Sequence, residues 1–70
     1  MRKGVLVPQC ESERLDIRFS PTEYYGGLHC EETFEVQIHG KWIPTRIEMG
    51  RNWYLVGVQT DHLISLIVRI

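Results

Sequence analysis

Apolar and polar residues alternate almost without a break across residues 33–58, and glycines interrupt the alternation twice. A period of two is typical of a β-strand that buries one face, and a glycine between two such runs indicates a chain reversal. The pattern therefore predicts a three-stranded antiparallel meander. We expect a two-residue turn at His39-Gly40 and a second turn at Gly50-Arg51.

Turns of this length determine which residues face each other across the meander. Val36 is expected opposite Ile43 in the first hairpin, and Ile47 opposite Tyr54 in the second. A slip of one residue would move every side chain to the other face, so agreement of both registers on one apolar face supports the pairing. The expected inward residues are Phe34, Val36, Ile38, Ile43, Thr45, Ile47, Tyr54, Val56 and Val58.

The other face of the meander is mixed in character, because both tryptophans of the chain are expected among charged residues there. The same pairing places Gln37 beside Trp42. Pro44 cannot donate a ladder hydrogen bond, so it indicates a bulge or an edge position. The expected outward residues are Glu35, Gln37, Trp42, Pro44, Arg46, Glu48, Trp53 and Leu55.

Shorter strands are expected on both sides of the meander. Residues 4–8 form an apolar run that ends at a proline, residues 15–20 alternate with one polar face, and residues 66–70 alternate up to the end of the chain. Thr60 or Asp61 is expected to cap one helical turn before the last strand. The predicted fold is all-β. It is a small, strongly bent antiparallel sheet or an SH3-like barrel of five to six short strands, with an open sheet packed on the irregular segment 21–32 as the alternative.

Composition sets the broad class of the protein. The 70 residues are expected to form one domain, residues 1–70, with little core. The net charge is −1 and the basic residues are scattered, which disfavours a non-specific nucleic-acid binder. No apolar run is long enough for a signal core or a membrane span, so we expect a cytoplasmic protein without a membrane partner. Cys10 and Cys30 are expected to be free thiols.

Residue types that carry chemistry are present but poorly grouped. His29 and Cys30 are adjacent, and neighbours on a strand point to opposite faces, so we expect no metal site. No recognisable signature of a nucleophile surrounds Cys30, and the two glycines at 26–27 lack the helix start and lysine of a phosphate loop. We therefore expect no catalytic residues, no cofactor and no enzymatic activity.

Several short motifs carry a resemblance to a known family. The spacing Gly-x-Trp-Ile…Arg-Ile-Glu…Trp-Tyr-Leu within residues 24–70 resembles a small bacterial domain-of-unknown-function family, found mostly in Gram-positive bacteria. The resemblance implies no established activity. The family pattern has a glycine after Cys30 and another before the final strand, where this chain has Glu31 and Ser65. The matching segments are Leu28-His29-Cys30, Phe34-Glu35-Val36, Gly40-Lys41-Trp42-Ile43, Thr45-Arg46-Ile47-Glu48, Trp53-Tyr54-Leu55-Val56-Gly57 and Val68-Arg69-Ile70.

The outward face of the meander is the best candidate for a functional surface. Aromatic residues beside arginine are common anchors of binding surfaces. We therefore expect a non-enzymatic module that binds a protein partner, or a second copy of itself. The alternative is a small nucleic-acid-binding β barrel, with Arg14, Arg18, Arg46 and Arg51 on phosphates. A third reading is purely structural, with both tryptophans covered by another segment. The expected binding residues are Trp42, Arg46, Glu48, Trp53 and Leu55.

Overall fold

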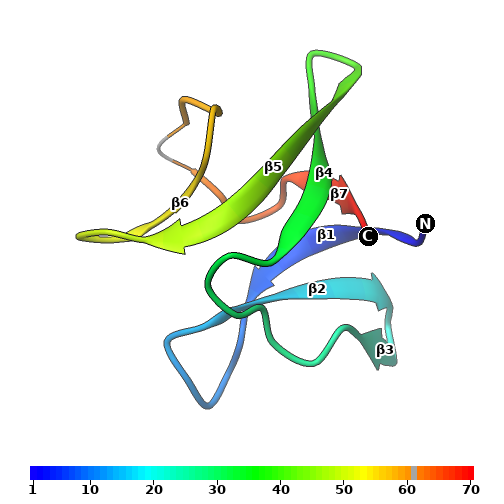
Figure 1. Ribbon diagram of the computed structural model, residues 1–70. Helices are drawn as coiled ribbons and strands as arrows, with labels where there is room; N and C mark the ends of the chain where they lie inside the picture. The colour runs from blue at the N-terminus through cyan, green and yellow to red at the C-terminus, as the bar shows by residue number, and fades with distance from the viewer. Residues whose placement is uncertain (61) are drawn as a thin grey trace.

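The computed structural model describes residues 1–60 and 62–70, and it is all-β, as predicted (Figure 1). Every strand pairs antiparallel to its neighbours, in the order β3-β2-β1-β7-β4-β5-β6. Over the described residues there is no helix, and hence none that could cross a membrane. The strands are β1 (Lys3–Pro8), β2 (Leu15–Ser20), β3 (Glu23–Tyr24), β4 (Thr33–Ile38), β5 (Lys41–Met49), β6 (Trp53–Leu55) and β7 (Ile67–Arg69).

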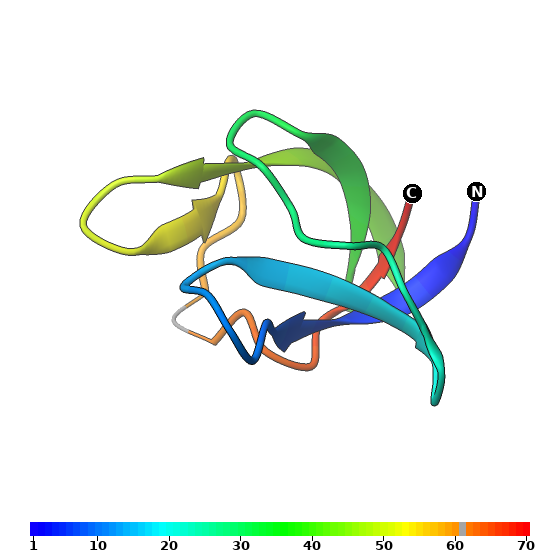
Figure 2. The same cartoon turned by 90° about the horizontal axis from the view of Figure 1, so that it is seen from below.

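The sheet is strongly bent but not closed by strand pairing. Figure 2 shows β1 and β2 on one side of the molecule and β4 and β5 on the other, with the segment after β3 running between them. Leu28 N donates to the Leu15 carbonyl of β2 at 2.7 Å, and Glu31 N donates to the Ile47 carbonyl of β5 at 2.7 Å. This segment therefore bridges the two sides, which matches the predicted alternative of an open sheet packed on residues 21–32.

The core fills the concave side of the bent sheet. Alternating residues of each strand meet there, because successive side chains of a strand point to opposite faces. Leu28 of the bridging segment is fully buried among them. The buried apolar residues are Leu6, Leu15, Ile17, Leu28, Phe34, Val36, Ile47, Leu55 and Val68.

The first hairpin has the predicted register. Val36 pairs with Ile43 and Gln37 with Trp42. Thr45 faces inward and is buried, and its hydroxyl donates to the Val56 carbonyl at 2.8 Å, which satisfies the polar group. Pro44 pairs with Glu35 of β4, and β6 pairs with β5 only at Ile47–Met49, so the proline lies on an open stretch of β5, as expected for an edge position.

The second hairpin is shifted by one residue from the prediction. Its turn contains three residues, 50–52, so Ile47 pairs with Leu55 and Glu48 pairs with Tyr54. Leu55 consequently faces the core with 2% exposure, and Tyr54 faces outward with 48% exposure. The expected faces of both residues were wrong because Gly50-Arg51 does not specify a two-residue turn in the way that Asn-Gly does.

The predicted helical turn before the last strand is absent from residues 62–66. This stretch ends in a tight turn in which Leu66 N donates to the Leu63 carbonyl at 3.2 Å. Ser65 N donates to the Leu6 carbonyl at 2.8 Å, and Leu6 N donates to the Leu66 carbonyl at 2.9 Å. Apart from this one turn, the backbone of the stretch pairs with β1 instead of forming a helical turn. Of the two predicted caps, Asp61 lies outside the described residues.

One expected surface position is buried. Asp16 on β2 is only 5% exposed. Its Oδ1 accepts hydrogen bonds from Ile17 N at 2.8 Å and from Gly26 N and Gly27 N at 2.9 Å each. Both glycines have positive φ angles, 111° and 102°, which glycine adopts readily. The carboxylate therefore anchors the start of the bridging segment to β2.

Candidate functional site

Trp42 lies on the convex, outer face of the sheet, where three strands meet. The ring is half-buried, and the Arg69 guanidinium carbon lies 4.2 Å from its centroid. Arg69 Nε donates to Glu35 Oε1 at 2.5 Å, so β4 holds the arginine in place. Planar guanidinium groups stack well on aromatic faces. The indole is thus part of a layer built from β7, β4 and β5.

An ion pair extends this layer along β5. Arg46 Nε donates to Glu48 Oε2 at 2.9 Å, and the arginine side chain is 53% exposed. Arg46 and Glu48 lie on the same side of β5 as Trp42, because they follow it at even spacing. We refer to Trp42, Arg69, Glu35, Arg46 and Glu48 as the outer-face cluster. It carries two positive and two negative side chains around one tryptophan.

The predicted binding residues divide between the two faces of the sheet. Trp42, Arg46 and Glu48 come together on the outer face, whereas Leu55 belongs to the core. Trp53 pairs with Met49, not with Glu48, and packs against the core. The one-residue shift of the second hairpin is the cause, since it moves Trp53 and Leu55 to the concave side.

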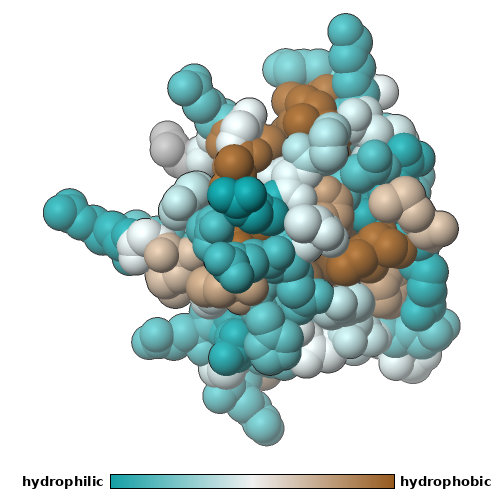
Figure 3. All heavy atoms as spheres, in the orientation of Figure 1, coloured by the Kyte–Doolittle hydropathy of each residue, from teal (hydrophilic) through white to brown (hydrophobic). Residues whose placement is uncertain are grey.

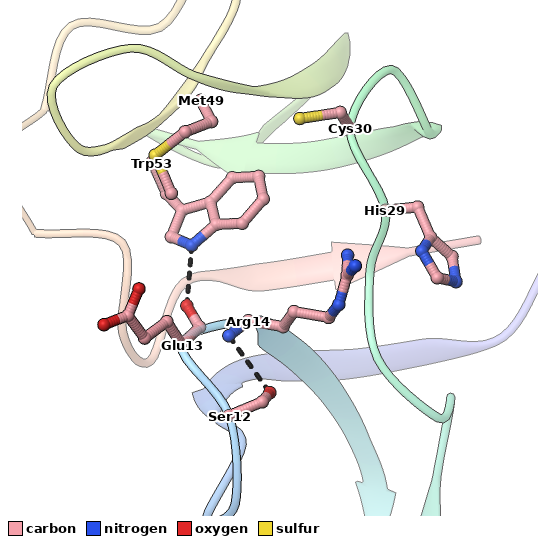
Figure 4. Close-up of a pocket in the computed structure, with 7 residues that line it drawn as sticks. All are labelled: Ser12, Glu13, Arg14, His29, Cys30, Met49 and Trp53. Carbon is pink, nitrogen blue, oxygen red and sulfur yellow. Dashed lines mark hydrogen bonds between the residues drawn. The ribbon is translucent and has the colours of Figure 1, made fainter.

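Trp53 instead stands at an open depression of about 630 Å³ at one end of the molecule (Figure 4). Its Nε1 donates to the Glu13 carbonyl at 2.7 Å. In Figure 4 the Cys30 thiol and the Arg14 guanidinium point toward the space beside the indole, while His29 points away. The depression is lined by Ser12, Glu13, Arg14, His29, Cys30, Met49 and Trp53.

At this depression the candidate nucleophile and its candidate base do not come together. Cys30 and His29 point in different directions, so the imidazole is not placed to activate the thiol (Figure 4). Across residues 1–60 and 62–70, no three His, Cys, Asp or Glu side chains are grouped to hold a metal ion. The arrangement can present an indole, a thioether, a thiol and a guanidinium to a ligand.

A hydrogen-bonded pair secures the bridging segment beside the depression. The Tyr25 hydroxyl donates to Glu32 Oε2, and His29 N donates to Glu32 Oε1 at 2.8 Å. The bond to Glu32 raises the pKa of Tyr25, with smaller contributions from burial and from the negative charge of that carboxylate. Glu32 thus binds both the Tyr25 side chain and the His29 backbone of the bridging segment.

The surface of the molecule carries no single dominant apolar area on the face seen in Figure 3. That view shows several separate hydrophobic patches among hydrophilic side chains. Scattered patches of this kind are normal for a protein surface.

The sequence did not identify Arg69 as a member of the cluster. Arg69 pairs with Glu35 because β7 lies between β1 and β4, an arrangement that joins the two ends of the chain. Local alternation contains no information about which strand becomes the neighbour of β4. The one available signal was charge, since a lone arginine in an apolar final strand needs a partner or solvent.

Comparison with known proteins bears out the resemblance seen in the sequence. Residues 4–70 match the family model "Domain of unknown function (DUF5348)", which adds the first two strands to the matching region. A crystal structure of a protein from Ruminococcus gnavus, a Northeast Structural Genomics Consortium target, is similar with a TM-score of 0.93. The two sequences are 49% identical, over 99% of this chain and 100% of that chain. No curated protein matches this chain.

Proposed function

The chain belongs to the DUF5348 family of domains of unknown function, and we propose that it is a non-enzymatic module that binds a protein partner through its outer-face cluster. The observation that carries the proposal is the Trp42 ring on the convex side of the sheet, with Arg69 stacked on it at 4.2 Å. Trp and Arg are the residues most enriched at the energetic centres of protein interfaces.

The cluster is arranged in advance of binding. Glu35 orients Arg69, Arg69 orients the indole, and the three strands beneath them are part of the sheet. A side chain that is already ordered loses less conformational entropy when a partner binds. The Arg46–Glu48 pair beside the indole would then orient the partner by charge. We infer that Trp42 is the anchor and that the charged residues supply specificity.

Nucleic acid is less well supported as the partner. Arg46 is paired with Glu48, and Arg14 lines the depression on the other side of the sheet. Arg18 lies on β2, and Arg51 lies in the β5–β6 turn. The basic residues expected on phosphates therefore do not gather on one surface. Because phosphate neutralisation supplies most of the affinity of non-specific binding, a cluster with balanced charges favours a protein partner.

The proposal is tested by photo-crosslinking followed by affinity measurement. A benzoylphenylalanine at Gln37, which lies beside Trp42, is activated in cells that express the domain, and the crosslinked protein is identified by mass spectrometry. The purified partner is then titrated against the wild type and Trp42→Ala. Truncation of an anchor typically costs at least 2 kcal/mol, so we expect affinity to fall by about 30-fold.

Arg51→Ala is the matched control, because it removes an exposed residue from the turn at the far end of β5. It should bind like the wild type. If the crosslinked protein is the domain itself, light scattering should show a dimer that Trp42→Ala converts to a monomer. Equal affinity of wild type and Trp42→Ala, or salt-dependent retardation of single-stranded oligonucleotides instead of protein binding, would overturn the proposal.

A further inference from the structure

We infer a second docking groove, between β1 and β2, that takes an extended peptide segment in which acidic residues flank an apolar side chain. The groove has a volume of about 350 Å³. Its apolar lining includes Val5 and Ile67, both half-buried and on the same face of the sheet, together with Pro21, and its charged lining is Lys3 and Arg18, both exposed. This inference concerns a different surface from the Trp42 anchor, so either can fail without the other.

The sheet register brings the groove residues together. Val5 pairs with Arg18 of β2 on one side and with Ile67 of β7 on the other. Gly4 lines the groove with its backbone, and on the opposite, concave side an added Cβ would be 2.5 Å from the Arg18 carbonyl oxygen and 2.7 Å from Ile17 Cγ2. Glycine therefore lets β1 and β2 lie close together beneath the groove.

The charge of the groove is opposite in sign to that of the whole chain. None of its lining residues is acidic, while the net charge of the chain is −1. No carboxylate that the structure describes forms an ion pair with Lys3 or Arg18. Arg18 Nε donates to the Ser20 carbonyl at 3.2 Å, which orients the guanidinium and leaves its other N–H groups for a ligand. Glu23 of β3, which lies opposite Ser20 in the sheet, is paired with Arg2.

These features select the chemistry of the occupant. An apolar side chain would pack on Val5 and Ile67, and carboxylates on either side of it would meet Lys3 and Arg18. The groove is shallow and open, whereas sites for small molecules enclose most of the ligand surface. A short chain segment, which needs only some of its side chains buried, fits such a groove better than a small carboxylate does.

The test uses peptides acetyl-Glu-Glu-X-Glu-Glu-amide, with X as Leu, Ile, Phe or Met, and a matched set with Lys in place of Glu. The intact ¹⁵N-labelled domain is titrated with each peptide at low salt. We expect saturable shifts of the Val5, Arg18 and Ile67 amides with at least one Glu peptide, and at least tenfold weaker binding of its Lys counterpart. Arg18→Glu should reduce the affinity for the Glu peptide at least tenfold, and Arg51→Glu should leave it unchanged.

Several results would overturn the inference. One is the absence of saturable shifts with all four Glu peptides, and another is equal affinity of wild type and Arg18→Glu. Co-sedimentation with phosphatidylserine vesicles without binding of the Glu peptides would identify the groove as a membrane contact instead. An unchanged amide spectrum outside the groove confirms that Arg18→Glu is folded, and Lys3→Glu provides a second charge reversal should it not be.

Discussion

The guanidinium of Arg69 lies 4.2 Å from the centre of the Trp42 ring and is held there by Glu35. The contact joins the last strand of the chain to the central hairpin, and we expect it to contribute to stability as well as to shape. A double-mutant cycle with Trp42→Leu and Arg69→Met should give a coupling free energy of about 0.5–1 kcal/mol in urea unfolding. Additive effects of the two substitutions would contradict a stacking interaction.

The ion pair between Arg46 and Glu48 on the same face serves as a comparison for the Trp42–Arg69 contact. Arg46 is 53% exposed on its side chain, and ion pairs in solvent are screened and weak. A cycle with Arg46→Gln and Glu48→Gln should therefore give a coupling of about 0.3 kcal/mol, which salt reduces further. A larger coupling than that of Trp42 and Arg69 would mean that β5, not the stack, dominates the stability of the outer-face cluster.

Asp16 should be among the most sensitive polar positions. Asp16→Ala leaves three backbone N–H groups without their acceptor, and we expect the free energy of unfolding to fall by about 3 kcal/mol. Asp16→Asn retains one acceptor oxygen and should lose about half as much. Urea unfolding measures both, with the exposed Glu11→Ala as the control. A wild-type rate of amide hydrogen exchange at Gly27 in Asp16→Ala would show that the anchor is not needed.

Glu31 and Ser65 occupy backbone conformations that suit glycine. Their φ angles are 72° and 76°, in the left-handed region that favours glycine. The left-handed conformation costs a residue with a Cβ about 1–2 kcal/mol, and glycine avoids this cost. Glycine is more flexible in the unfolded state, however, which reduces its gain in folding free energy by about 0.5–1 kcal/mol. Glu31→Gly and Ser65→Gly should each stabilise the domain by about 0.5–1 kcal/mol in urea unfolding.

The two glycine substitutions should also be additive, because they lie in separate turns. Thr33→Gly provides the control. Thr33 begins β4 and does not have a positive φ, so glycine there should destabilise the domain by about 0.5–1 kcal/mol. Destabilisation by Glu31→Gly would indicate that the glutamate side chain, rather than the backbone of the turn, decides the stability at that position.

The hydrogen bond from Tyr25 to Glu32 makes stability depend on pH in the alkaline range. The bond raises the pKa of Tyr25 above its ordinary value of about 10, so the neutral phenol is favoured in the folded state. The bond contributes fully to stability when the pH is below the pKa of Tyr25 in the unfolded state. This contribution is lost as the pH rises through the pKa of Tyr25 in the folded state. Tyr25→Phe should therefore lose less stability than the wild type between about pH 9 and pH 12.

Urea unfolding at each pH measures this difference, and Tyr54→Phe is the control because it leaves the Tyr25–Glu32 bond intact. The difference should be small, since Tyr25 is 40% exposed and solvent screens the interaction. Parallel alkaline profiles for wild type and Tyr25→Phe would contradict the assignment of the bond.

Local alternation and turn residues predicted the first hairpin correctly, because pairing Phe34 with Thr45 and Val36 with Ile43 places the apolar residues of both strands on one face. The second hairpin was misplaced by one residue, since a glycine beside an arginine permits turns of two or three residues. That single residue decided whether Trp53 and Leu55 joined Trp42 on the outer face. Turns of two and three residues differ in free energy by much less than the core contributes to stability. The pattern of apolar and polar residues therefore does not predict the turn length.

Other features depended on contacts between distant parts of the chain. The burial of Asp16 depends on Gly26 and Gly27, which are ten and eleven residues away, and the stack on Trp42 depends on Arg69. The segment before β7 formed a turn rather than a helix because its backbone pairs with β1. In each case, tertiary contacts override the local structural preference of the sequence.

The most direct test of the proposed function is the affinity of Trp42→Ala and Arg51→Ala for the protein that crosslinks at Gln37, measured by calorimetry beside the wild type. We expect the affinity of Trp42→Ala to be about 30-fold lower than that of the wild type, and the affinity of Arg51→Ala to be unchanged. Wild-type affinity of Trp42→Ala, with its fold intact by circular dichroism, would contradict the claim that the outer-face cluster is the binding surface.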